Sequence, residues 1–204
     1  MSVFLLGLRD DMLSEADVER LKGALPENMS LLFTVDYETF APHAEKIEVA
    51  AGWFRSKWIR EMAQVKWVHQ WGAGTDWLLE YPDLIEKSFI LTNSVGVSAI
   101  PMSEHILGMM LHHSRNFRNA LAAQREKHWA KLFHPTEDHH AHPRNLSWED
   151  MAELAGQTVL LVGVGAIGQR VARLAKAFEM SVIGVRNNPA KGDPNVDQMV
   201  GVDQ

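Results

Sequence analysis

The chain has 204 residues, 46% hydrophobic and 23% charged, a composition that excludes general disorder and allows one large domain or two small ones. The net charge of −6 gives no basic balance of the kind that favours nucleic acid. Cysteine is absent, which suits a reducing compartment, and no apolar run approaches the roughly 18 residues that a membrane helix needs. We therefore expect a cytoplasmic protein that binds neither nucleic acid nor membrane.

Short apolar runs alternate with helical patterns through the first half of the chain. Strands are predicted at residues 3–8, 30–35, 47–52, 65–70 and 89–92. Helices are predicted from Ser14 onward and at residues 43–46, 56–64 and 78–85. This alternation indicates a parallel sheet covered on both faces, so residues 1–98 are expected to form one small α/β domain.

The turn at residues 71–76, Trp-Gly-Ala-Gly-Thr-Asp, follows the fourth of these strands. Ligands of parallel sheets bind at the carboxyl ends of the strands. Gly72 and Gly74 leave the N–H groups of Ala73 and Gly74 uncovered, an arrangement suited to a carboxylate. The alternative interpretation is an ordinary connecting loop.

One long helix is predicted from Pro101 to about His128, as a spine that joins two domains. Histidines gather in the polar loop that follows, at His134, His139, His140 and His142. Because this loop has neither helical ligand spacing nor cysteine, we interpret it as solvated and predict no metal site. His69, at a strand end, is interpreted as a hydrogen-bonded core histidine, with a ligand-facing role as the alternative.

The most informative motif begins with a buried-strand run at residues 158–162. Gly163, Gly165 and Gly168 follow as G-x-G-x-x-G, then an amphipathic helix and a second apolar run at residues 180–185. Strand, tight turn, helix and strand form the order of a dinucleotide-binding unit. The glycines permit the turn, the approach of pyrophosphate and close helix packing, and the helix start holds the phosphates. The alternative is a glycine-rich turn without a ligand.

Arg186 follows the second strand, where an NAD-preferring fold usually has an acidic residue for the ribose 2′-hydroxyl. A guanidinium attracts a 2′-phosphate, whereas a carboxylate repels it. The sequence therefore predicts NADP(H) as the preferred cofactor, with NAD(H) as the alternative if Arg186 only points to solvent.

The chain resembles the D-isomer-specific 2-hydroxyacid dehydrogenases, and specifically their glyoxylate and hydroxypyruvate reductases. The order and spacing of four features carry the resemblance, which covers nearly the whole chain. They are residues 70–76 (QWGAGTD), residues 92–105 (TNSVGVSAIPMSEH), Trp129 after the predicted long helix, and residues 154–168 (LAGQTVLLVGVGAIG).

The resemblance implies a flavodoxin-like, parallel-sheet substrate domain at residues 1–98 and the N-terminal half of a Rossmann cofactor domain at residues 99–204. It implies hydride transfer between NAD(P)H and a small 2-oxo or 2-hydroxy acid, and homodimerisation through the cofactor domains. By motif match, Ala73 and Gly74 bind the substrate carboxylate, and Met102 lies near the nicotinamide. The other candidate cofactor-binding residues are Gly163, Gly165, Ala166, Ile167, Gly168, Arg186 and Asn187.

One departure from the family matters. Its catalytic Arg, Glu and His come well after the second Rossmann strand, and here no histidine follows His142. No catalytic residue is therefore assigned. We expect the chain to be the first two-thirds of such an enzyme and to be inactive alone. We also expect the strand at residues 158–162 to have one unpaired edge. The competing interpretation is a truncated, non-catalytic paralogue that binds nucleotide or a partner.

Overall fold

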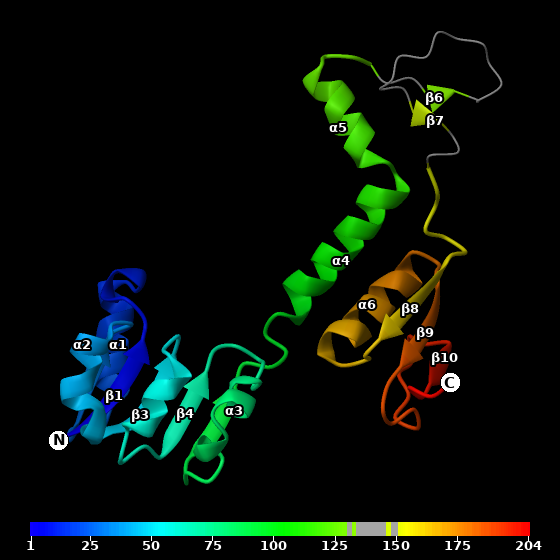
Figure 1. Cartoon of the computed structure of the whole chain (residues 1–204). Helices are drawn as coiled ribbons and strands as arrows, with labels where there is room; N and C mark the ends of the chain where they lie inside the picture. Colours follow the sequence, from blue (N-terminus) through cyan, green and yellow to red (C-terminus); the bar gives the residue numbers. More distant parts are fainter. Residues whose placement is uncertain (130–131, 134–145, 148–150) are drawn as a thin grey trace. The chain divides into compact units, whose positions relative to one another are not determined.

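The structure is a computed structural model that describes residues 1–129, 132–133, 146–147 and 151–204 (Figure 1). The chain divides into two compact units, Met1–Val95 and Gly96–Gln204. Each unit has its own parallel sheet and its own hydrophobic core. No helix in the described ranges is both long enough and apolar enough to cross a membrane.

The first unit is built on a five-stranded parallel sheet with the order β2-β1-β3-β4-β5. This is the flavodoxin-like order, so the predicted fold of this part is confirmed. The strands lie within two residues of their predicted starts and ends, as β1 (Ser2–Gly7), β2 (Met29–Phe33), β3 (Ile47–Gly52), β4 (Trp67–Gln70) and β5 (Ile90–Asn93).

Short helices connect these strands: η1 (Asp10–Met12), α1 (Glu15–Ala24), α2 (Tyr37–Phe40), η2 (Ala41–Lys46), η3 (Ser56–Arg60), α3 (Trp77–Glu80) and η4 (Pro82–Leu84). Ser14 starts α1 as predicted, because its side chain accepts a hydrogen bond from the N–H of Asp17. Two helix predictions were too long. The predicted helix 56–64 is the 3₁₀ helix η3, and the predicted helix 78–85 is interrupted at Tyr81, just before Pro82.

Both faces of this sheet carry buried side chains, as a parallel sheet requires. Leu5 points to one face, where it joins Phe40 and Trp58, whose rings stack with centroids 4.5 Å apart. Leu6 points to the opposite face, which α1 covers through Leu21. The successive burial of Leu5 and Leu6 explains why β1 is an unbroken apolar run in the sequence.

Two glycines bring β1 and β3 into close contact at the carboxyl end of the sheet. The N–H of Trp53 donates to the carbonyl oxygen of Gly7 across 2.7 Å. A Cβ on Gly7 would lie 2.8 Å from the carbonyl carbon of Trp53, and one on Gly52 would lie 2.8 Å from the oxygen of Gly7. Gly52 also has φ +101°, a conformation that other residues rarely adopt.

The second unit begins with α4 (Ala99–Ser114) and α5 (Phe117–Arg125), where one continuous helix was predicted (Figure 1). That prediction was wrong because Asn116 adopts a left-handed conformation with φ 48° and ends the first helix. Asparagine tolerates this conformation better than most residues. Helix α4 packs against the later helix α6.

The rest of this unit contains β8 (Thr158–Val162), α6 (Ala166–Ala177), β9 (Ser181–Val185) and β10 (Gln198–Val200). The sheet order is β10-β9-β8 with all pairs parallel, which is one half of a Rossmann sheet. The partial Rossmann prediction is confirmed. The strand β10 was not predicted, because it lies in what reads as a polar tail. A separate short pair, β6 (Leu132–Phe133) and β7 (Leu146–Ser147), is also parallel.

Strand β8 lies at the edge of its sheet, with β9 as its partner within the described part of the chain. Its side chains alternate. Val159 and Leu161 pack against the core formed by α6 and β9, whereas Leu160 is 60% exposed and Val162 is 81% exposed. In the described residues, one face of this sheet is therefore covered by the core of the second unit, and the edge formed by β8 has no neighbouring strand.

Candidate functional site

The glycine turn joins β8 to α6 in the geometry that its sequence indicated. Gly163 has φ +100°, and its N–H donates to the carbonyl oxygen of Val185 at 2.9 Å. Gly165 precedes the first residue of α6, and a Cβ built on it meets no atom within 4 Å. Gly168 has no such space, because its Cβ would lie 2.2 Å from the carbonyl oxygen of Gly163. The turn is therefore tight, open above Gly165 and closely packed at Gly168.

A pocket of about 500 Å³ adjoins this turn. The pocket is lined by residues at and just after the carboxyl ends of β8 and β9 and by one residue after β10. They are Val162, Gly163, Val164, Gly165, Val185, Arg186, Asn187, Asn188 and Val202. Four predicted cofactor residues, Gly163, Gly165, Arg186 and Asn187, thus share one pocket. Ala166, Ile167 and Gly168 form the first turn of α6, whose N–H groups are free to hold an anion.

Arg186 is the charged residue among those that line this pocket. Its side chain is half-buried, and its Nη1 donates to the carbonyl oxygen of Lys191 at 2.8 Å. Its backbone N–H donates to Val200 in β10. The guanidinium is therefore held beside the pocket, and the pocket lining contains no carboxylate to repel an anion.

Asp197, the residue before β10, holds that strand in place beside β9. Its carboxylate accepts hydrogen bonds from Lys176 Nζ, at 2.8 and 2.9 Å, and from the N–H of Val182 at 2.7 Å. The hydrogen bond from Lys176 is the main cause that holds the pKa of Asp197 below its usual value. Asp197 therefore ties the start of β10 to both α6 and β9.

Met102 lies in the first turn of α4, and it is not among the residues that line the pocket. The loop before α4 does approach the glycine turn. A Cβ on Gly96 would lie 3.9 Å from the Cβ of Ala166, the first residue of α6.

In the first unit, two side-chain amides organise the turn that contains Ala73 and Gly74. Gln70 Nε2 donates to the carbonyl oxygens of Gly72, at 2.9 Å, and of Gly74, while Asn93 Nδ2 donates to that of Ala73 at 2.8 Å. Three successive carbonyl groups are thus occupied. The N–H groups of Ala73 and Gly74 have no hydrogen-bond partner among the described residues. This arrangement leaves two neighbouring backbone donors free in the turn after β4.

Sequence reasoning missed the roles of Gln70 and Asn93. Trp77 Nε1 donates to Gln70 Oε1 at 2.6 Å and so fixes which end of the amide faces the turn. Gln70 and Asn93 are also register partners at the ends of β4 and β5. The available signal was the pair of amide residues at the ends of two neighbouring predicted strands.

The histidines that the sequence singled out lie in two different parts of the chain. His69 is hydrogen-bonded as predicted, with Nδ1 2.8 Å from Thr92 Oγ1 and Nε2 3.5 Å from Ser94 Oγ. It is only half-buried, however, and does not belong to the hydrophobic core of the first unit. The loop histidines 134, 139, 140 and 142 lie outside the described residues. Within the described ranges, no group of three His, Cys, Asp or Glu side chains is placed to hold a metal ion.

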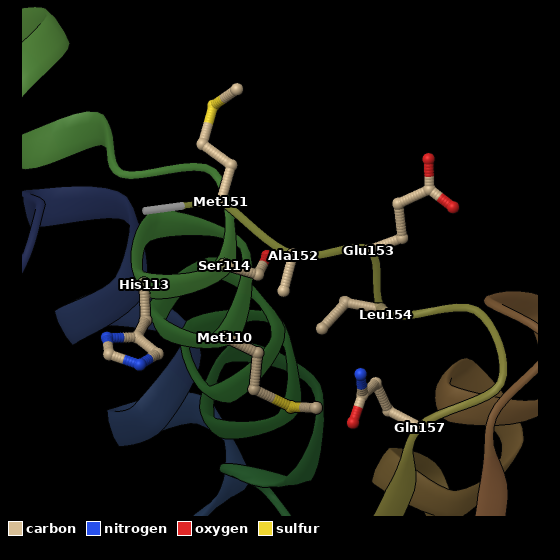
Figure 2. A pocket seen from close by; sticks show the side chains of 8 residues that line it. All are labelled: Met110, His113, Ser114, Met151, Ala152, Glu153, Leu154 and Gln157. Atoms are coloured by element: carbon tan, nitrogen blue, oxygen red, sulfur yellow. The ribbon is translucent and has the colours of Figure 1, made fainter. Parts of the chain in front are cut away.

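A second pocket in this unit, of about 550 Å³, lies between α4 and residues 151–157 (Figure 2). It contains His113, Ser114 and Glu153, but Figure 2 shows the imidazole and the carboxylate pointing away from each other. Ser114 Oγ donates to the carbonyl oxygen of Leu111. This pocket also lies at the amino end of β8, whereas ligands of such sheets bind at the carboxyl ends. The pocket beside the glycine turn is therefore the stronger candidate.

Known proteins are similar to this chain in sequence. Residues 107–204 match the family model described as D-isomer specific 2-hydroxyacid dehydrogenase, NAD binding domain. A D-3-phosphoglycerate dehydrogenase of Methanocaldococcus jannaschii is 31% identical over 127 residues, which cover 62% of this chain and 21% of the relative. A hydroxypyruvate reductase of Thermotoga maritima is 32% identical over 111 residues, 54% of this chain and 31% of the relative.

The fold also has solved counterparts. The crystal structure of a D-isomer specific 2-hydroxyacid dehydrogenase family protein from Aeromonas salmonicida superposes with a TM-score of 0.75 at 24% identity. That match covers 99% of this chain and 58% of the solved chain. The chain therefore spans less than two-thirds of each of these three proteins. The match to the family model and to the two curated relatives confirms the resemblance drawn from the sequence.

Proposed function

We propose that this chain, whose residues 107–204 match the family model described as D-isomer specific 2-hydroxyacid dehydrogenase, NAD binding domain, belongs to that family and binds a nicotinamide dinucleotide beside its glycine turn. The protein would then transfer hydride between NAD(P)H and a small 2-oxo or 2-hydroxy acid. The observation that supports this most directly is the pocket that joins Gly163 and Gly165 to Arg186 at the start of α6. We expect the pyrophosphate at the N–H groups of that helix start.

Within this proposal, residues 99–204 form the cofactor domain and residues 1–98 the substrate domain. The free N–H groups of Ala73 and Gly74 bind the substrate carboxylate, because Gln70 and Asn93 hold the neighbouring carbonyl oxygens in place. The bound nicotinamide supplies the hydride chemistry. The chain's own contribution is to fix both molecules: the first turn of α6 holds the phosphates, and Met102 lies on the nicotinamide side.

The preferred cofactor in this proposal is NADP(H) over NAD(H). Arg186 offers a guanidinium at the end of β9, and no residue in the pocket lining carries a negative charge. A 2′-phosphate is therefore attracted, whereas an NAD-selective site would present an acid there. A substrate of the glyoxylate or hydroxypyruvate class is part of the same proposal, as is a cytoplasmic location.

The protein is also proposed to be a homodimer that associates through its cofactor domains. Helix α5 exposes apolar side chains, with Phe117 45% and Leu121 47% accessible. Exposed apolar residues on one helix favour burial against another protein surface. Sedimentation velocity of the chain and of Leu121→Asp tests this, because the substitution should shift a dimer to monomer.

Calorimetric titration of the chain with NADPH and NADH tests dinucleotide binding. Gly165→Val should weaken binding about tenfold or more, which corresponds to about 1.4 kcal/mol, because a side chain there blocks the backbone from the pyrophosphate. Gly108→Val in α4 is the matched control, since a Cβ on Gly108 also meets nothing within 4 Å. Unchanged affinity in a folded Gly165→Val chain would contradict the proposal.

The competing function is that of a non-catalytic protein that binds nucleotide or a partner. Turnover of NADPH with glyoxylate distinguishes the two. We expect that residues 1–204 alone bind the cofactor without turnover, and that their fusion to the C-terminal segment of an active 2-hydroxyacid dehydrogenase gives turnover. If such a fusion also lacks turnover with 2-oxo acids, the binding-protein alternative is the better one.

A further inference from the structure

We infer that Trp77 is a positioning residue for the substrate carboxylate: its indole N–H orients the Gln70 amide and so sets the affinity of a site that it does not touch. This inference rests on the proposed binding of a carboxylate at Ala73 and Gly74, and it deepens that proposal. Trp77 lies outside the turn, at the first position of α3.

Trp77 closes the loop of residues 71–76 at its base. Its Nε1 donates to Oε1 of Gln70, the last residue of β4, at 2.6 Å. The two residues flank the loop directly, one before it and one after it. One hydrogen bond therefore joins the end of a strand to the start of a helix across the whole loop.

The indole also decides which way the Gln70 amide points. An indole N–H can only donate, so the amide atom that faces Trp77 must be the oxygen. The amide nitrogen then points into the loop, where it donates to the carbonyl oxygens of Gly72, at 2.9 Å, and of Gly74. If the amide turned over, its oxygen would face two carbonyl oxygens and repel them. The donor pattern inside the loop therefore depends on the indole N–H.

Both partners of this hydrogen bond are held by parts of the first unit outside the loop. The backbone of Gln70 lies between Gly52 of β3 and Asn93 of β5 in the sheet register. The ring of Trp77 is half-buried and packs against the hydrophobic core of the unit. The hydrogen bond thus fixes an exposed loop to the sheet and to the core at once.

Planar peptide units carry this orientation to the free donors. In a trans peptide the carbonyl oxygen and the following N–H point in opposite directions, and the chain has no cis peptide among the described residues. Gln70 holds the carbonyl of Gly72 and so aims the N–H of Ala73, whereas Asn93 holds the carbonyl of Ala73 and aims the N–H of Gly74. A carboxylate then meets donors that are already in place, which avoids the entropy cost of ordering the loop.

Nuclear magnetic resonance titration of the chain with oxamate, an amide analogue of glyoxylate, tests this inference. Ethyl oxamate is the neutral probe that lacks the carboxylate. In the unaltered chain we expect oxamate, and not its ester, to shift the amide resonances of Ala73 and Gly74. Trp77→Phe keeps an aromatic ring in the core and removes the N–H. It should weaken oxamate binding about threefold to tenfold, the range of one lost hydrogen bond, and should reduce the shift at Ala73 more than at Gly74.

Two further variants separate the hydrogen bond from the packing of the ring. Trp58→Phe is the matched control, because Trp58 belongs to the same core and its Nε1 has no hydrogen-bond partner among the described residues. It should leave oxamate affinity within about twofold of the unaltered chain. In a Gln70→Met background, Trp77→Phe should weaken binding no further, since its effect passes through Gln70.

Unchanged oxamate affinity in Trp77→Phe, an equal loss in Trp58→Phe, or an additive loss in the double variant overturns the positioning role of Trp77. The carboxylate site would stand in each of these cases. If neither amide of the unaltered chain responds to oxamate, the carboxylate site itself falls, and this inference falls with it. A non-additive loss confined to Trp77→Phe and Gln70→Met supports the inference.

Discussion

At the scale of single residues, the carbonyl oxygen of Gly163 leaves no room for a side chain on Gly168. A Cβ on Gly168 would lie 2.2 Å from it, and that oxygen belongs to the backbone of the turn. We predict that Gly168→Ala lowers the free energy of unfolding by about 1–3 kcal/mol or more, because the turn and the helix must move apart.

Gly108→Ala in the middle of α4 is the matched control for this change. Its added Cβ meets nothing within 4 Å, so the alanine should stabilise the helix by about 0.5–1 kcal/mol. Urea denaturation followed by circular dichroism measures both. Equal effects of the two substitutions would show that helix propensity, and not the contact with Gly163, governs Gly168.

The prediction on cofactor choice depends on the positive charge of Arg186. Arg186→Asp should move the preference from NADPH toward NADH by about tenfold or more in the ratio of dissociation constants, because a repulsive charge replaces an attractive one beside the 2′-phosphate. Fluorescence titration with both cofactors measures the ratio. If the unaltered protein already binds NADH as tightly as NADPH, the assigned role of Arg186 is wrong.

At the scale of elements, Asp197 couples the stability of the β9–β10 pair to pH. Its pKa is lowered from 3.8, mainly by the hydrogen bond from Lys176 and then by that from Val182. A lowered pKa in the folded state stabilises the fold above pH 3.8, and this contribution is lost as the pH falls through the lower, folded-state pKa.

The amide resonance of Val182 should follow this titration in nuclear magnetic resonance spectra, because its N–H donates to Asp197 Oδ2. We predict a midpoint below 3.8 in the unaltered chain, and no such titration in Asp197→Asn. Lys176→Met should raise the midpoint toward the usual value of 3.8. A midpoint at or above that value in the unaltered chain would contradict the assigned hydrogen bonds.

The elements that the sequence predicted best are those with strong periodicity and defined ends. The strands of the first sheet and the glycine turn were found because runs of four to six residues, rich in apolar side chains, end at glycine or polar residues. The break at Asn116 was missed because no glycine or proline marks it in the sequence. The left-handed (αL) conformation of Asn116 depends on the local backbone geometry, which the residue pattern does not show. The strand β10 was missed because three residues carry no periodicity and its pairing to β9 depends on Asp197.

At the scale of the whole molecule, the unpaired edge of β8 favours self-association of the chain. Leu160 is 60% exposed on this edge strand, and natural edge strands often carry lysine to prevent pairing with another chain. We predict that Leu160→Lys slows the aggregation of residues 1–204 at 37 °C, by about twofold or more in half-time, while the unfolding temperature changes little.

Leu161→Lys is the contrasting variant, because its side chain points to the opposite face and packs against the core of the second unit. A charge there should unfold the unit and speed aggregation. Light scattering at matched concentrations compares the two. Equal aggregation of the unaltered chain and Leu160→Lys would mean that the β8 edge is not the associating surface.

The contact between Gly7 and Gly52 has a consequence for how this sequence can evolve. A Cβ on Gly7 would strike main-chain atoms of Trp53 and Phe54, which follow β3, and a Cβ on Gly52 would strike main-chain atoms of Gly7 in β1. No change of a facing side chain can therefore make room for either. The two positions should therefore tolerate no substitution singly and gain nothing from being changed together. In a library randomised at both, glycine should be recovered at each position independently, and the pair should show no covariation although the two residues touch.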